Sequence, residues 1–239
     1  VYINHNTLQG NQAGDALGGG GGGARLGDVV ASSVEIKENR VANNTATDIG
    51  GGLHIGQINK GTLDFSGNEI SQNTIYSDPL KHGGGLYIDQ MKLGAVVTMT
   101  GNTLTGNRAT GNGGGCYIRG DIEEGVTYIF RQNHVDHNIA EQNGGGCYFV
   151  EVVDSNVIKS SLLEVVDNTF DHNTAGGDYG GLFVADLKNS YLRFWRNQLV
   201  GNRAGISGTI STGGNGGGLY FAAIDLGSTV DFRDNEVIS

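Results

Sequence analysis

The sequence predicts an all-β protein, a right-handed parallel β-helix of about eight coils with three short strands in each coil. Three observations predict this fold: a repeat that spans the chain, apolar residues at alternate positions inside each repeat, and asparagine or glycine between the apolar segments. Self-similarity of this kind is typical of a solenoid, whose successive repeats stack into one continuous core. We expect residues 1–239 to form a single β-helix domain.

Each repeat follows the template h-x-h-x-x-N-x-h-x-x-N-x-A, in which h is an apolar residue. The spacing between repeats varies from 29 residues (Asn39 to Asn68) to 38 residues (Asn197 to Asn235), but the offsets inside the template stay the same. Stacked coils would place equivalent asparagines above one another in an amide ladder. The first asparagine of the template supplies this expected ladder at Asn39, Asn68, Asn102, Asn133, Asn168 and Asn197.

The three strands of a coil follow from apolar residues at alternate positions, because alternate residues of a strand face the same side. In one repeat, Val34 and Ile36 begin the inward face, Val41 continues it, and Leu53 and Ile55 complete it after a glycine run. Between these strands, asparagine and glycine corners tolerate a left-handed backbone. We therefore expect a dry interior lined on three sides.

Composition and charge exclude several classes of partner. The 239 residues carry a formal net charge of −10, which argues against nucleic acid because phosphate binding needs clustered Lys and Arg. No apolar run approaches the length of a membrane-spanning helix, so we expect no direct insertion into a membrane. Val1 starts inside one coil and Ser239 ends inside another, so we expect a segment of a longer chain with open strand edges.

The repeat resembles that of the polymorphic outer-membrane protein family, which carries F-x-x-N and G-G-A-[ILVY] motifs on a β-helical passenger. The first motif matches at residues 65–68, 130–133, 194–197 and 232–235, and the second resembles the glycine triplets before Leu53, Leu86, Cys116, Cys147 and Leu219. The resemblance implies an extracellular or cell-surface location and often an adhesive role, and it carries over no catalytic residue. The broader pectin-lyase-like superfamily shares the coil, but a fold does not fix a function.

An aromatic row is the first candidate site. The residue between the two inward positions of the third strand should point outward, and this position is aromatic in six repeats: His54, Tyr87, Tyr117, Tyr148, Phe183 and Tyr220. A stacked, exposed row of rings could bind a glycan or a surface protein. Alternatively, loops cover the row, or the rings serve only as cross-strand pairs.

A polar cluster is the second candidate, formed by two Asp-His pairs at the same offset in adjacent repeats. Its members are His134, Asp136, His137, Asp171 and His172. Neighbouring strands are about 4.8 Å apart, so the pairs could touch and bind a metal or support acid–base chemistry. The alternative is a solvated corner, since other repeats carry glycine, asparagine or glutamine at the histidine position.

Acidic residues and cysteines complete the candidates. The acidic residues could bind calcium, which favours clustered oxygen ligands, either at the loop of Asp121, Glu123 and Glu124 or along the outward row of Glu35, Asp64, Glu164 and Asp231. Solvated surface is the preferred interpretation of both groups.

Cys116 and Cys147 occupy equivalent positions in adjacent coils, and we expect buried free thiols in preference to a disulfide.

The sequence thus favours a non-catalytic structural or adhesive module of an extracellular or cell-surface protein, without an assigned cofactor, metal site or catalytic residue. One alternative is a polysaccharide-active enzyme of the pectin-lyase-like type. The other is a filament subunit that associates with itself, end to end, through its open coils.

Overall fold

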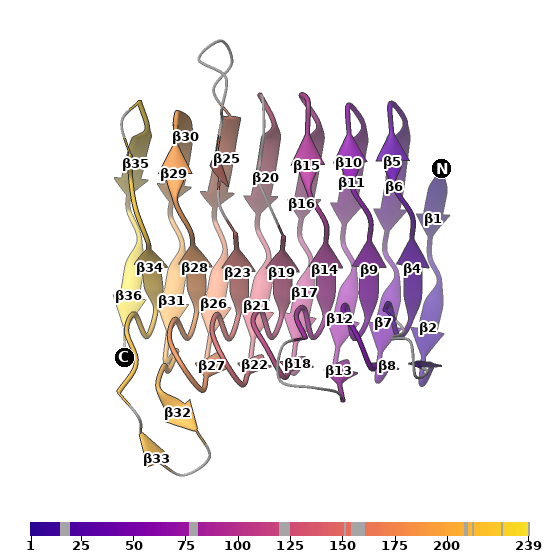
Figure 1. Ribbon diagram of the computed structural model, residues 1–239, viewed down its shortest axis with the longest axis horizontal. Helices are drawn as coiled ribbons and strands as arrows, with labels where there is room; N and C mark the ends of the chain where they lie inside the picture. The colour runs from indigo at the N-terminus through magenta and orange to yellow at the C-terminus, as the bar shows by residue number, and fades with distance from the viewer. Residues whose placement is uncertain are drawn as a thin grey trace.

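The computed structural model describes residues 1–14, 20–76, 81–119, 125–150, 152–153, 161–207, 210–211, 213–225 and 227–238. These residues form strands, turns and bends, with no helix among them, and the strands stack in parallel as a β-solenoid (Figure 1). The predicted all-β, parallel β-helix is therefore confirmed. No helix within the described ranges has the length and apolar character needed to cross a membrane.

Three long parallel sheets form the walls of the solenoid. The first wall contains β1 (Tyr2–Asn4), β6 (Ser33–Lys37), β11 (Thr62–Ser66), β16 (Val96–Thr100), β20 (Thr127–Arg131), β25 (Ser161–Val166), β30 (Ser190–Trp195) and β35 (Thr229–Arg233). The second wall contains β2 (Thr7–Gln9), β7 (Arg40–Ala42), β12 (Glu69–Ser71), β17 (Thr103–Thr105), β21 (His134–Asp136), β26 (Thr169–Asp171), β31 (Gln198–Val200) and β36 (Glu236–Ile238). The third wall contains β4 (Ala24–Leu26), β9 (Leu53–Ile55), β14 (Leu86–Ile88), β19 (Cys116–Ile118), β23 (Cys147–Phe149), β28 (Leu182–Val184) and β34 (Leu219–Phe221).

Shorter strands pair between the walls. A fourth sheet consists of β3 (Gln12–Ala13), β8 (Thr45–Ala46), β13 (Thr74–Ile75), β18 (Arg108–Ala109), β22 (Ile139–Ala140) and β27 (Thr174–Ala175). Additional parallel pairs involve β5 (Val29–Val30), β10 (Ile58–Asn59), β15 (Met91–Lys92), β24 (Val152–Val153) and β29 (Leu187–Lys188). One antiparallel hairpin, β32 (Ile206–Ser207) with β33 (Ile210–Ser211), projects from the last turns (Figure 1).

The coil therefore contains more strands than the expected three. The additional strand β8 follows the second template asparagine, where the chain runs beside its neighbours long enough to pair two residues, as Thr45 and Ala46 do with Thr74 and Ile75. Six turns carry a strand in each of the four sheets, from the turn of β1 to the turn of β25. The solenoid thus has about six complete turns and not the expected eight, because the first two walls contain eight strands each but the fourth sheet contains six among the described residues.

The core lies in the space between the walls, as the alternation predicts. Inward residues at equivalent template positions pair in register, for example Phe65 with Met99 and Met99 with Phe130. From the turn of β6 to the turn of β25, the predicted inward residues are at most 6% exposed. Like residues therefore stack on like, and each new coil covers the apolar face that the previous coil leaves open.

Two asparagine ladders run along the core, and the predicted first ladder is confirmed. The side-chain oxygen of Asn102 accepts hydrogen bonds from the backbone N–H and from Nδ2 of Asn68, at 2.9 and 3.0 Å. Asn102 Nδ2 in turn donates to Phe65 O and to Asn133 Oδ1, each at 2.9 Å. Every hydrogen-bonding position of this buried amide is therefore used, which is the condition for burying a polar group at little cost. The second template asparagine forms an equivalent ladder at Asn11, Asn44, Asn73, Asn107, Asn138, Asn173 and Asn202.

A left-handed residue precedes the ladder asparagine at the corner between two walls. Gln132 has φ of 53° before Asn133, and His137 has φ of 50° before Asn138. We expected the corner asparagines themselves to tolerate this conformation, but in the ladders the preceding residue adopts it. The ladder asparagine is thereby turned inward, and the corner residue before it is placed on the outside of the solenoid.

Candidate functional site

The aromatic row exists as a continuous ladder along the third wall. Parallel pairing brings His54 beside Tyr87, Tyr87 beside Tyr117, and so on through Tyr148, Phe183 and Tyr220. The rings of Tyr87, Tyr117 and Tyr148 lie nearly parallel, with successive centroids 5.4 and 5.3 Å apart. The predicted stacking from coil to coil is therefore confirmed.

The expectation that this row is exposed is wrong for most of its length. His54, Tyr87, Tyr117 and Phe183 are 2 to 8% exposed, and only Tyr148 and Tyr220 are half-buried. For every ring of the row except Phe183, the cover includes the left-handed glycine corner that precedes the ring. A Cβ on Gly83 would lie 2.9 Å from Tyr87 Cβ, and one on Gly113 would lie 2.8 Å from Tyr117 Cβ, so the glycine backbone itself packs on the row.

Two further rings, which the sequence analysis missed, stack on the row. His82 lies 4.6 Å from Tyr117 between centroids, and Tyr179 lies 4.4 Å from Phe183 and 4.5 Å from Tyr220. Tyr179 stands where six other coils have the first glycine of a triplet, and its φ of 66° matches the φ of 62 to 72° at those glycines. The replacement of this glycine by tyrosine is the feature of the sequence from which the contact of Tyr179 with the row could have been predicted.

Burial disfavours the ionised form of the phenols in this row. It raises the pKa of Tyr148 to about 12 and raises the pKa values of Tyr87 and Tyr117 as well, so these hydroxyls remain hydrogen-bond donors at physiological pH. At the opposite end of the row, His54 Nε2 lies 3.3 Å from Asp89 Oδ2. This contact is the main reason that the pKa of Asp89 is lowered below its usual value, despite partial burial of the carboxylate.

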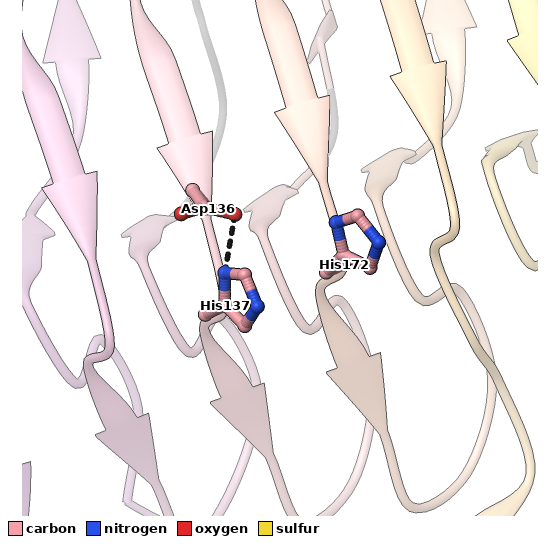
Figure 2. Close-up of side chains that lie close together, drawn as sticks. All are labelled: Asp136, His137 and His172. Carbon is pink, nitrogen blue, oxygen red and sulfur yellow. Dashed lines mark hydrogen bonds and ion pairs between the residues drawn. The ribbon is translucent and has the colours of Figure 1, made fainter.

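The polar cluster lies in β21, at the end of β26 and at the corners that follow these strands, on the outside of the solenoid (Figure 2). The rings of His137 and His172 stack with centroids 5.1 Å apart and an angle of 13° between their planes. His137 Nδ1 lies 2.5 Å from Asp136 Oδ1, and His172 Nδ1 lies 3.8 Å from Asp171 Oδ1. The expected contact between the two Asp-His pairs is thus present.

His134 completes the cluster from strand β21. Its Nε2 lies 3.8 Å from Asp136 Oδ2, so the Asp136 carboxylate stands between two imidazoles of its own coil. Asp136, His137 and His172 each offer a ligand atom, and these three atoms lie within 4.8 Å of one another. Within the described ranges, this is the one group of at least three His, Cys, Asp or Glu side chains that meets such a distance limit.

The acidic row of the first wall is neutralised by cations. Lys37 Nζ lies 2.9 Å from Glu35 and 2.6 Å from Asp64, and Arg233 Nε lies 2.5 Å from Asp231. The expectation of a solvated surface is wrong for the fourth member, Glu164, whose side chain is 5% exposed. It lies between the guanidinium groups of Arg131 and Arg193, which come from the strands on either side. The other acidic candidates, Asp121, Glu123 and Glu124, lie outside the described residues.

The two cysteines are buried and free. Cys116 and Cys147 pair directly across β19 and β23, and their Sγ atoms lie 2.7 Å apart. Burial is the main cause that raises the pKa of the Cys147 thiol. A raised pKa disfavours the thiolate that would act as a nucleophile or as a metal ligand. These thiols fill core positions that leucine occupies in neighbouring coils.

Comparison with protein-family models finds no match for this chain, and searches of curated proteins and of solved structures find none either. The fold is therefore established as a parallel β-solenoid on the coordinates alone. The resemblance to the polymorphic outer-membrane repeat stays a prediction.

Proposed function

We propose that this chain is a non-catalytic structural and adhesive module of an extracellular or cell-surface protein. In this proposal the solenoid presents one end of the aromatic ladder to a glycan or a surface protein. The contact surface consists of Tyr148, Tyr179 and Tyr220, the three half-buried tyrosines that surround Phe183.

The observation that carries the proposal is the placement of Tyr179. A bulky residue with φ near 66° is a backbone outlier, with a cost on the order of 1–3 kcal/mol that glycine would avoid. In return, its ring stacks on both Phe183 and Tyr220 and widens the aromatic surface beyond the ladder. Such an exception at a corner that is otherwise glycine is more readily explained by binding than by stability.

The chemistry of this surface suits recognition. Tyrosine offers a flat apolar ring and a polar hydroxyl with few rotatable bonds, so little conformational entropy is lost when it binds. Both hydroxyls are protonated donors at neutral pH, and partial burial raises the pKa values of Tyr148 and Tyr179 further above the ordinary value near 10. The underlying strands are fixed by in-register parallel pairing with their neighbours, so the spacing of the rings is set before a partner arrives.

The substitution Tyr179→Gly tests the proposal, because glycine is the residue that the fold itself uses at this corner. We expect binding on a glycan array and to intact cells to fall at least about tenfold, while the melting temperature stays equal or rises. Tyr76→Ala is the matched control, since the Tyr76 side chain is 73% exposed. Unchanged binding in Tyr179→Gly, or a wild-type chain that binds neither glycans nor cells, would refute the proposal.

A further inference from the structure

The polar cluster has the donor set of a transition-metal site. Two imidazoles and one carboxylate come from adjacent coils, with their ligand atoms within 4.8 Å of one another. Imidazole nitrogen is a preferred ligand of Zn²⁺, Cu²⁺ and Ni²⁺, whereas Ca²⁺ and Mg²⁺ favour sites made entirely of oxygen. We propose that Asp136, His137 and His172 bind one divalent transition-metal ion, with Zn²⁺ as the ion to test.

The separations of the three ligand atoms are close to those of a zinc site, so binding an ion needs only a small movement of the side chains. Zinc–nitrogen bonds of about 2.0–2.1 Å in a tetrahedral site place two ligand atoms about 3.3 Å apart. The most widely separated pair of ligand atoms must therefore approach by at most about 1.5 Å, whereas Asp136 Oδ1 and His137 Nδ1, 2.5 Å apart, must separate slightly to bind the same ion. The side chains of His137 and His172 are 65% and 53% exposed, so both rings can tilt toward a shared ion by rotation about their own bonds.

The neighbouring carboxylates already orient the two rings. Asp136 Oδ1 lies 2.5 Å from Nδ1 of His137, so two of the three proposed ligand groups already face each other within one coil (Figure 2). Asp171 Oδ1, which is buried and has no hydrogen-bond partner in the described structure, lies 3.8 Å from His172 Nδ1. Pairing of a ligand imidazole with a second carboxylate is the arrangement that fixes ring orientation in metal sites.

The following coil makes space for this arrangement. Gly201 occupies the equivalent corner after β31, and a Cβ there would lie 2.9 Å from Cδ2 of the His172 ring. A larger residue at Gly201 would displace that ring from its stack on His137. The two histidines thus lie in adjacent coils, with glycine at the next corner and the Asp136–Asp171 register holding their strands together.

Asparagine is the appropriate replacement for each histidine, because Asn43 occupies the same left-handed corner in an earlier coil with φ of 54°. The variants His137→Asn and His172→Asn are therefore compatible with the backbone of the fold. His5→Asn is the matched control: His5 is also left-handed, with φ of 58°, and pairs with Glu38 at 3.1 Å, but it belongs to no three-residue group.

Calorimetric titration of the metal-free chain with ZnCl₂ tests the proposal. We expect one Zn²⁺ per chain in the wild type and in His5→Asn, at least about tenfold weaker binding in each single variant, and no saturable binding in the double variant. Addition of CaCl₂ should not displace the zinc. The proposal is overturned if the wild type shows no saturable Zn²⁺ binding up to millimolar concentration, or if the double variant binds as the wild type does.

Discussion

Asn102→Ala is the substitution that tests most directly how the solenoid is held together. The wild-type side chain makes four hydrogen bonds inside the core: two that it accepts from Asn68 and two that it donates, to Phe65 O and Asn133 Oδ1. Alanine leaves the backbone N–H and one Nδ2 hydrogen of Asn68 without acceptors. It also removes one of the donors to Phe65 O and to Asn133 Oδ1.

The cost can be worked from these contacts. A buried donor without an acceptor costs about 1–3 kcal/mol, so two stranded donors amount to about 4 kcal/mol, with a smaller addition for the two acceptors. Whole domains unfold with about 5–15 kcal/mol, so one amide would account for a large share of the stability. Asn102→Asp should cost more than alanine, because the carboxylate keeps the volume but presents oxygen to two acceptor oxygens and buries a charge.

Urea denaturation followed by circular dichroism and by the fluorescence of Trp195 measures the effect. Asn6→Ala is the control, since Asn6 is exposed and its side chain only donates, to Asn39 Oδ1 and Asn4 O. We expect that control to lose less than about 1 kcal/mol. Equal losses for Asn6→Ala and Asn102→Ala would refute the reasoning that the ladder, rather than apolar packing alone, stabilises the stack.

Three more outcomes follow from the core and its edges. Cys116 and Cys147 should resist alkylation by N-ethylmaleimide in the folded chain and both react in guanidinium, and a denatured chain that takes up no reagent would contradict the free thiols. Glu164→Ala should cost about 1–3 kcal/mol in urea denaturation, less than a fully buried ion pair because its two arginine partners are partly exposed and can reach water. The lowered pKa of Asp89, due chiefly to His54, stabilises the fold above the unfolded pKa near 4, and this contribution is lost as pH falls through the folded pKa. Asp89→Asn should therefore flatten the acid side of a stability-against-pH curve, and an unchanged curve would refute the assignment.

The interior was predictable from the sequence because two simple periodicities determine it. The alternation of apolar residues within strands predicted that Val34, Phe65 and Phe170 lie in the core. The fixed position of asparagine within the repeat predicted the asparagine ladder. Both patterns are local and repeat in every coil, so the prediction made from one repeat can be checked against the sequence of the next. The second asparagine ladder and the fourth sheet follow the same template and could have been anticipated from it.

The exterior was less predictable. The burial of an outward side chain depends on the backbone path at the corners, which the repeat template does not specify. Tyr117 alternates outward as expected, yet the Gly113 backbone and the His82 ring bury it. Glu164 is likewise outward in its strand, but arginines from both neighbouring strands enclose it. The cell-surface location, the enzyme hypothesis and the filament hypothesis depend on partners and stay predictions.

The left-handed corners explain why the two proposed sites lie where they do. At the corners of His137 and His172, the ladder asparagine that follows carries the hydrogen bonds that join coils, so the corner residue itself has no role in the core. Glycine is the least strained choice there, and any other residue costs conformational energy that must be offset by a contact. His137, His172 and Tyr179 are among the non-glycine residues in this conformation, and each contacts a group outside the core. Stability and recognition are thus carried by different residues of the same repeat. Replacing a corner residue with the glycine or asparagine of another coil should alter binding and spare the fold, while replacing the adjacent ladder asparagine should do the reverse.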